Sequence, residues 1–148
     1  MMVTQTEQGL TDRDYRRKAL LSDDSSAWTK YPLPDWFKEA EASLKQLTVL
    51  GPGWDSYNAK PISQYFIKLA WEFLSMIAQL YPPKPHVGPV PDGGVQIEWH
   101  TNGIDLEVEF SPEDGIVFFY KDKTQTIEDE LDFSSSVMAT IEAIKKLK

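Results

Sequence analysis

Apolar side chains recur every three or four residues in two segments of the first half of the chain, residues 34–50 and 64–80. In each segment these positions fall on one side of a helix, which predicts two amphipathic helices with one buried face. Pro34 suits the first turn of the earlier helix. The Gly-Pro-Gly triplet at 51–53 ends that helix, and the two prolines at 82–83 end the later one.

The hydrophobic period changes to two after residue 86, which predicts β-strands. Asn102-Gly103 is a strong signal for a two-residue hairpin loop. With this loop, each inward residue of the strand before it faces an apolar residue of the strand after it. The pairs are Trp99 with Leu106, Ile97 with Val108 and Val95 with Phe110. Because every inward pair is apolar, the pattern predicts this register.

Residues 116–121 indicate a third strand, and residues 87–90, which contain a proline, suit a fourth strand at the sheet edge. Residues 132–148 have one apolar stripe and end in lysines, which predicts a closing helix capped by a serine between 134 and 136. The expected fold is therefore α+β: an antiparallel meander of three to four strands, with two helices before it and one after it packed on one face. Residues 31–148 form this domain, and residues 1–30 form an N-terminal extension.

The formal net charge of the 148 residues is −8, from 23 acidic and 15 basic side chains. This balance disfavours direct binding to nucleic acid or to anionic membranes. There is no apolar run long enough to span a bilayer and no secretory signal at the start. The absence of cysteine excludes disulfides and thiolate metal sites. We expect a cytoplasmic protein without a cofactor.

The hairpin register also predicts how polar side chains pair on the outward side of the sheet. The outward pairs are His100 with Asp105, Glu98 with Glu107 and Gln96 with Glu109. Directly opposed like charges are unfavourable. The simplest interpretation is a solvated acidic face, eased by water or by Lys121 or Lys123. The alternatives are a surface for a basic partner, or a metal or acid–base site with Glu98, His100 and Glu107.

No motif typical of serine hydrolases or of phosphate-binding and dinucleotide-binding loops is present. His86 has no evident partner in the sequence, which indicates a structural or surface role.

The loop GPGWDSYNAKPIS, residues 51–63, concentrates aromatic and polar side chains. One interpretation is a structural plug, in which Trp54 and Tyr57 bury their rings and Asp55 or Asn58 hydrogen-bonds loop amides. The other is a ligand cleft. Its residues are Asp55, Tyr57, Asn58 and Lys60.

Together the GWDSYNAKPIS loop, the PDGGVQIEW segment and IDLEVEFSPEDG resemble a group of small bacterial proteins of uncharacterised function. Those proteins share a W-D-x-Y-x-A-x-P-I loop, then a helix, then a P-D-G-G-V-x-I-E-W hairpin. The resemblance covers about residues 51 to 115 and implies no particular activity. Residues 1–33 lie outside it.

In the third strand, Val117 and Phe119 face away from the side that the helices cover. We expect their apolar side chains to be covered by the extension, by a partner protein or by a second copy in a homodimer. The extension concentrates cations in an acidic chain, which predicts that it binds the partner. Its candidate residues are Arg13, Tyr15, Arg16 and Arg17.

These features favour a non-enzymatic bacterial interaction module that binds another protein, as an accessory, inhibitor or immunity-type subunit associated with a toxin or a defence system. The alternatives are a metal-dependent hydrolase that uses the acidic hairpin face, and an acidic mimic of nucleic acid.

Overall fold

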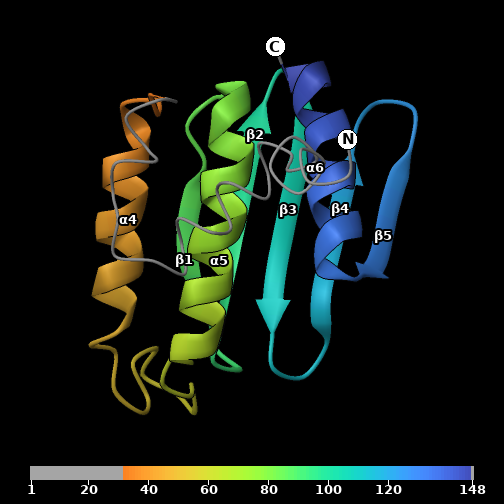
Figure 1. Cartoon of the computed structure of the whole chain (residues 1–148). Helices are drawn as coiled ribbons and strands as arrows, with labels where there is room; N and C mark the ends of the chain where they lie inside the picture. The colour runs from red at the N-terminus through yellow and green to blue at the C-terminus, as the bar shows by residue number, and fades with distance from the viewer. Residues whose placement is uncertain (1–31, 148) are drawn as a thin grey trace, which may run out of the picture.

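Five antiparallel strands form one sheet in the order in which they follow along the chain (Figure 1). The computed structural model describes residues 32–147. The strands are β1 (His86–Val90), β2 (Gly94–Thr101), β3 (Ile104–Ser111), β4 (Gly115–Lys121) and β5 (Thr126–Leu131). The meander is confirmed, but the expected count of three to four strands is wrong. The missed strand is β5, in which only Ile127 and Leu131 are apolar and three consecutive residues are acidic.

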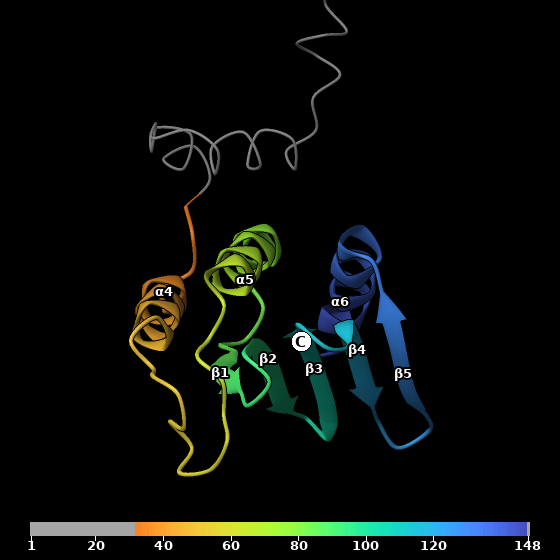
Figure 2. The same cartoon turned by 90° about the horizontal axis from the view of Figure 1, so that it is seen from below.

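Within residues 32–147, two helices precede the sheet and one follows it, as the periodicity predicts. They are α4 (Trp36–Leu47), α5 (Gln64–Ile77), which continues into the 3₁₀ turn η1 (Ala78–Leu80), and α6 (Phe133–Leu147). All three helices lie on the same face of the sheet (Figure 2). Helix α4 packs against β1 and α5, α5 reaches β2 and β3, and α6 covers β3, β4 and β5.

The predicted hairpin register is confirmed: Trp99 pairs with Leu106, and the apolar pairs continue along β2 and β3. The inward side chains of these strands are buried beneath the helices, and they make the centre of the core together with the apolar faces of α5 and α6. Phe73 of α5 meets Phe110 of β3 edge to face, with 5.4 Å between the ring centroids. Burial of this aromatic pair joins the helical layer to the sheet.

Two tryptophans fix the proline segment between η1 and β1. The indole N–H of Trp36 donates to the carbonyl of Pro82 at 3.0 Å, and that of Trp99 donates to the carbonyl of Pro83 at 2.7 Å. A ring that is largely buried thus keeps a partner for its one polar group. The two bonds anchor the same segment to α4 and to β2.

Helix α6 begins one residue before the serines expected to cap it. The carboxylate of Asp132 accepts a hydrogen bond from the backbone N–H of Ser135 at 2.7 Å, so the cap is an aspartate. This bond lowers the pKa of Asp132 below its ordinary value. Asp132 directly follows the strand that sequence reasoning missed, which explains why the helix start was misplaced.

Among residues 32–147, no helix is long and apolar enough to cross a membrane. The predicted partner-binding residues Arg13, Tyr15, Arg16 and Arg17 lie outside the described residues.

Candidate functional site

The face of the sheet opposite the helices, called the open face below, is covered by no described helix or strand (Figure 2). Because the strands pair in register, its side chains lie in rows across the sheet. It is formed by His86, Gln96, Glu98, His100, Asp105, Glu107, Glu109, Val117, Phe119, Lys121, Thr126, Glu128 and Glu130. The three outward pairs predicted between β2 and β3 are confirmed.

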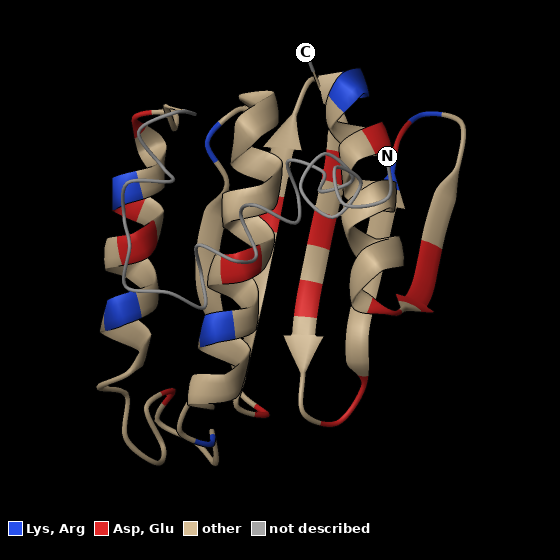
Figure 3. Ribbon diagram, viewed as in Figure 1, with Lys and Arg blue, Asp and Glu red and all other residues tan. Residues whose placement is uncertain are grey.

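Acidic residues dominate this face. Glutamate and aspartate recur at alternate positions of β3, and further acidic positions lie on β5, whereas the helices and loops carry most lysines (Figure 3). Among the strand residues that point to this side, Lys121 is the one lysine, and it pairs in register with Asp105. A sheet face on which acidic side chains outnumber basic ones attracts a ligand of positive charge.

Val117 and Phe119, predicted to bind a partner, lie in the middle of the acidic rows. In register, Phe119 stands between Glu107 of β3 and Glu128 of β5, and Val117 stands between Glu109 and Glu130. Both side chains are half-buried. They lie in a groove of about 660 Å³ whose remaining lining is acidic, called the acidic groove below.

The carboxylates at the centre of the open face ionise less readily than free glutamates. Partial burial raises the pKa of Glu107 above its ordinary value, and the charge of Glu98 adds to this effect. Partial burial also raises the pKa of Glu109, with the charge of Asp92 as the next cause. Their ionised forms are therefore disfavoured in the folded protein, and a cation nearby would relieve this cost.

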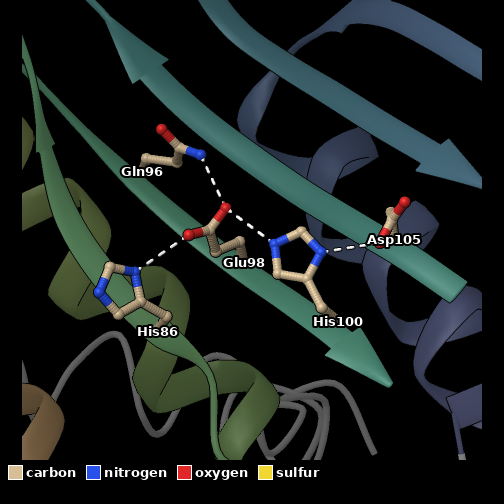
Figure 4. Close-up of polar contacts among 5 residues, drawn as sticks. All are labelled: His86, Gln96, Glu98, His100 and Asp105. Carbon is tan, nitrogen blue, oxygen red and sulfur yellow. Dashed lines mark hydrogen bonds and ion pairs between the residues drawn. The ribbon is translucent and has the colours of Figure 1, made fainter. Parts of the chain in front are cut away.

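A chain of polar contacts crosses β1, β2 and β3 beside this groove (Figure 4). The carboxylate of Glu98 accepts hydrogen bonds from Gln96 at 2.9 Å, His86 at 3.0 Å and His100 at 3.1 Å. The other ring nitrogen of His100 lies 2.7 Å from the carboxylate of Asp105. Two imidazoles and one amide thus contact the carboxylate of Glu98, whose side chain is only 20% exposed.

Both ring nitrogens of His100 face carboxylates, so the network favours the doubly protonated ring. The hydrogen bond to Asp105 is the main cause that raises the pKa of His100 above its ordinary value of 6.5, and the bond to Glu98 is the next. The sequence placed Glu98 opposite Glu107 but gave no partner for His86. The pairing of His86 with Glu98 in β1 and β2 supplies that partner.

The alternative metal ligands Glu98, His100 and Glu107 do not form a group that could enclose an ion. Among the described residues, the three side chains whose ligand atoms all lie within 4.8 Å of one another are Asp92, Glu109 and Asp114. One oxygen of Asp92 accepts the N–H of Gly94 at 3.0 Å, and the other accepts the hydroxyl of Ser111. Asp92 thus joins the β1–β2 turn to the end of β3.

The loop at 51–63 is stabilised by hydrogen bonds between its side chains and its own backbone. The carboxylate of Asp55 accepts the N–H groups of Tyr57 at 2.8 Å and Ala59 at 3.2 Å, and the indole N–H of Trp54 donates to the carbonyl of Lys60 at 2.8 Å. Trp54 is half-buried against the core, but Tyr57 is 82% exposed. The expectation that Tyr57 buries its ring is wrong, because the turn directs this side chain outward while Ala59 takes the buried position.

The alternative ligand cleft has four residues. The carboxylate of Asp55 already accepts hydrogen bonds from loop N–H groups, and Tyr57 and Asn58 are exposed. Lys60 reaches Glu113 of the β3–β4 turn, with 3.8 Å between Nζ and Oε1. The contacts of Asp55 and Lys60 thus stabilise the loop and its neighbour.

The loop docks on the PDGG turn between β1 and β2. The N–H of Lys60 donates to the carbonyl of Pro91 at 2.8 Å, and the N–H of Ser63 donates to that of Gly93 at 2.9 Å. Gly93 has a positive φ of 99°, and a side chain on Gly94 would collide with the carbonyl of Phe110. The 51–63 loop and the PDGG turn are therefore two halves of one packed corner.

Comparisons with protein-family models, with curated proteins and with solved structures find no match to this chain. The features that bear on function are therefore those of the open face itself. Sequence reasoning found its β2, β3 and β4 residues by alternation, but missed Glu128 and Glu130 because it missed β5. The signal available for them was the alternation of Ile127 and Leu131 with polar residues.

Proposed function

We propose that this chain is a non-enzymatic interaction module whose open face binds another protein through basic side chains, as an accessory, inhibitor or immunity-type subunit. The observation that carries the proposal is the acidic groove: two apolar side chains, Val117 and Phe119, between rows of glutamates on a sheet face that the described helices leave uncovered. Apolar centres with a charged rim are typical of protein-binding surfaces.

The energetics of Glu107 and Glu109 support the same function. Each carboxylate is held where its charged form is disfavoured, by partial burial and by neighbouring acids. A lysine or arginine of a partner would turn this repulsion into attraction and would add charge-assisted hydrogen bonds. The aliphatic parts of the same long side chains could cover Phe119.

The histidine network does not favour the hydrolase alternative. Glu98 and His100 already bond to each other and to Gln96, His86 and Asp105. A general acid or base must instead present a free proton or lone pair to its substrate. The described contacts therefore support a charged surface more than a catalytic pair.

The test is affinity capture from cells that express the protein naturally, with the full chain as bait. A Glu107→Gln/Glu109→Gln variant should lose the basic protein that the unmodified chain retains. An Asp35→Asn/Glu39→Gln variant removes the same charge at the start of α4 and should retain that protein. Equal capture by both variants would contradict the proposal. A captured protein that duplex DNA displaces would favour the nucleic-acid mimic.

A further inference from the structure

Strand β5 is the edge of the sheet opposite the edge next to α4 (Figure 1). An edge strand leaves alternate backbone N–H and C=O groups without a neighbouring strand. Thr126, Glu128, Asp129 and Glu130 are exposed, and Ile127 and Leu131 are half-buried. The described chain therefore ends this side of the sheet with a strand that another strand can extend.

The two sides of β5 differ in chemistry. On the open face, Glu128 and Glu130 line the acidic groove. On the helical side, Ile127, Asp129 and Leu131 line a second groove of about 380 Å³ between β5 and α6, with Ala139 of α6 also in its wall. This second groove is mainly apolar. Both grooves follow the same edge strand.

We propose that β5 is extended by a strand of the partner protein in which basic residues alternate with apolar residues. Side chains of an added strand point alternately to the two faces of the sheet. Those on the open face would meet Glu128 and Glu130, and those on the helical side would meet Ile127 and Leu131, with Asp129 between them. This inference rests on the proposed function and specifies the form of the partner: an extended, alternating cationic segment.

Charge determines which occupant fits. A second copy that paired its own β5 with this edge would bring Glu128, Asp129 and Glu130 close to the same acidic residues, and opposed like charges destabilise a sheet. The opposite edge strand, β1, is less suited to pairing with an added strand, because it contains Pro89, which has no backbone N–H to donate. A basic strand pairs favourably where a second copy is repelled.

The test uses capped seven-residue peptides and the full chain, with binding followed by backbone amide NMR shifts up to millimolar peptide. The probe alternates lysine and valine, Lys-Val-Lys-Val-Lys-Val-Lys. Its matched control has the same composition in blocks, Lys-Lys-Val-Val-Val-Lys-Lys. A third peptide alternates like the probe but carries N-methyl groups on alternate amides, which removes the donors that would face β5.

The alternating peptide should bind about tenfold more tightly than the block peptide, and its shifts should centre on β5. N-methylation should abolish the preference. A Glu128→Gln/Glu130→Gln variant should weaken binding by about three- to tenfold, whereas Asp35→Asn/Glu39→Gln, at the far edge, should leave it unchanged.

Equal binding of all three peptides on the open face would overturn strand addition but would support the proposed function, since charge alone would then be sufficient. No shift at the open face or at β5 with any peptide would contradict both. An Arg13→Gln/Arg16→Gln/Arg17→Gln variant should bind the alternating peptide as the unmodified chain does. Several-fold tighter binding would identify the protein's own extension as the occupant and overturn the assignment to a partner.

Discussion

On the side of the sheet that faces the helices, the inward positions of β2, β3 and β4 are apolar and buried. On the other side, β2 and β3 present mainly glutamate, histidine and aspartate, and β4 presents Val117, Phe119 and Lys121. Phe118 and Phe119 are consecutive in β4 and illustrate the contrast. Phe118 belongs to the core, and Phe119 lies half-buried between two rows of acids. Two residues adjacent in sequence thus lie in different environments, one in the core and one on the open face.

The comparison separates stability from function. Burial of the helical side stabilises the fold by removing apolar area from water. The open face contributes less, because its charges repel one another and partial burial disfavours the ionised forms of Glu107 and Glu109. A surface that contributes little to stability in the free protein and has complementary features for a basic ligand is what a binding role predicts.

The largest expected effect is the difference in stability loss between two phenylalanine substitutions, one on each side of the sheet. Phe110→Ala removes a fully buried ring that packs on Phe73, and we expect a loss of about 3–5 kcal/mol in the free energy of unfolding. Phe119→Ala should cost less than about 1 kcal/mol, since its ring is only half-buried. Chemical denaturation measures both. Similar losses at the two positions would show that the open face is a second core in the free protein.

A smaller effect with the opposite sign is expected for Glu107→Gln. The folded pKa of Glu107 is raised above the ordinary 4.5, so its contribution to stability falls as pH rises from 4.5 through the folded pKa. Glutamine does not ionise, so the variant should be more stable than the unmodified chain at pH 7, by about 0.2–1 kcal/mol after solvent screening. The difference should disappear below about pH 4. Denaturation at both pH values checks this, and a destabilised variant at pH 7 would contradict it.

The smallest effect concerns His100. Its folded pKa is raised above 6.5, so the stabilisation from its protonated ring is fully present below pH 6.5 and is lost as pH rises through the folded pKa. An imidazole titration by NMR should therefore give a pKa above 6.5. Asp105→Asn and Glu98→Gln should each lower that pKa, because the hydrogen bond to Asp105 is the largest cause of the rise and the bond to Glu98 is the next. Titration of His100 at or below 6.5 would refute the network.

The sequence predicted the helical side well because one physical signal, the alternation of apolar residues around Asn102-Gly103, specifies strand, register and face together. Strand β5 was not predictable with the same strength. Three consecutive acids, Glu128 to Glu130, obscure its alternation, and an edge strand beside a charged face needs few apolar residues.

The candidate site was predictable only in part for a related reason. The opposition of Glu98 and Glu107 follows from a single hairpin, but the contact between His86 and Glu98 requires the pairing of β1 with β2. Likewise, Asp92, Glu109 and Asp114 come together only when two turns meet at one end of the sheet. Local periodicity specifies elements, while contacts between distant segments depend on how those elements pack.

The most direct test of the open face as a binding surface is site-specific photo-crosslinking in cells that express the protein naturally. A photoreactive phenylalanine analogue at position 119 lies in the acidic groove, and the same analogue at position 138 replaces Met138, which is 56% exposed on α6. We predict a discrete adduct with a basic protein from position 119 and none from position 138. The adduct should disappear when Glu107→Gln/Glu109→Gln is combined with the analogue. An adduct from position 138 alone, or an unchanged adduct from position 119 in the charge variant, would contradict the account.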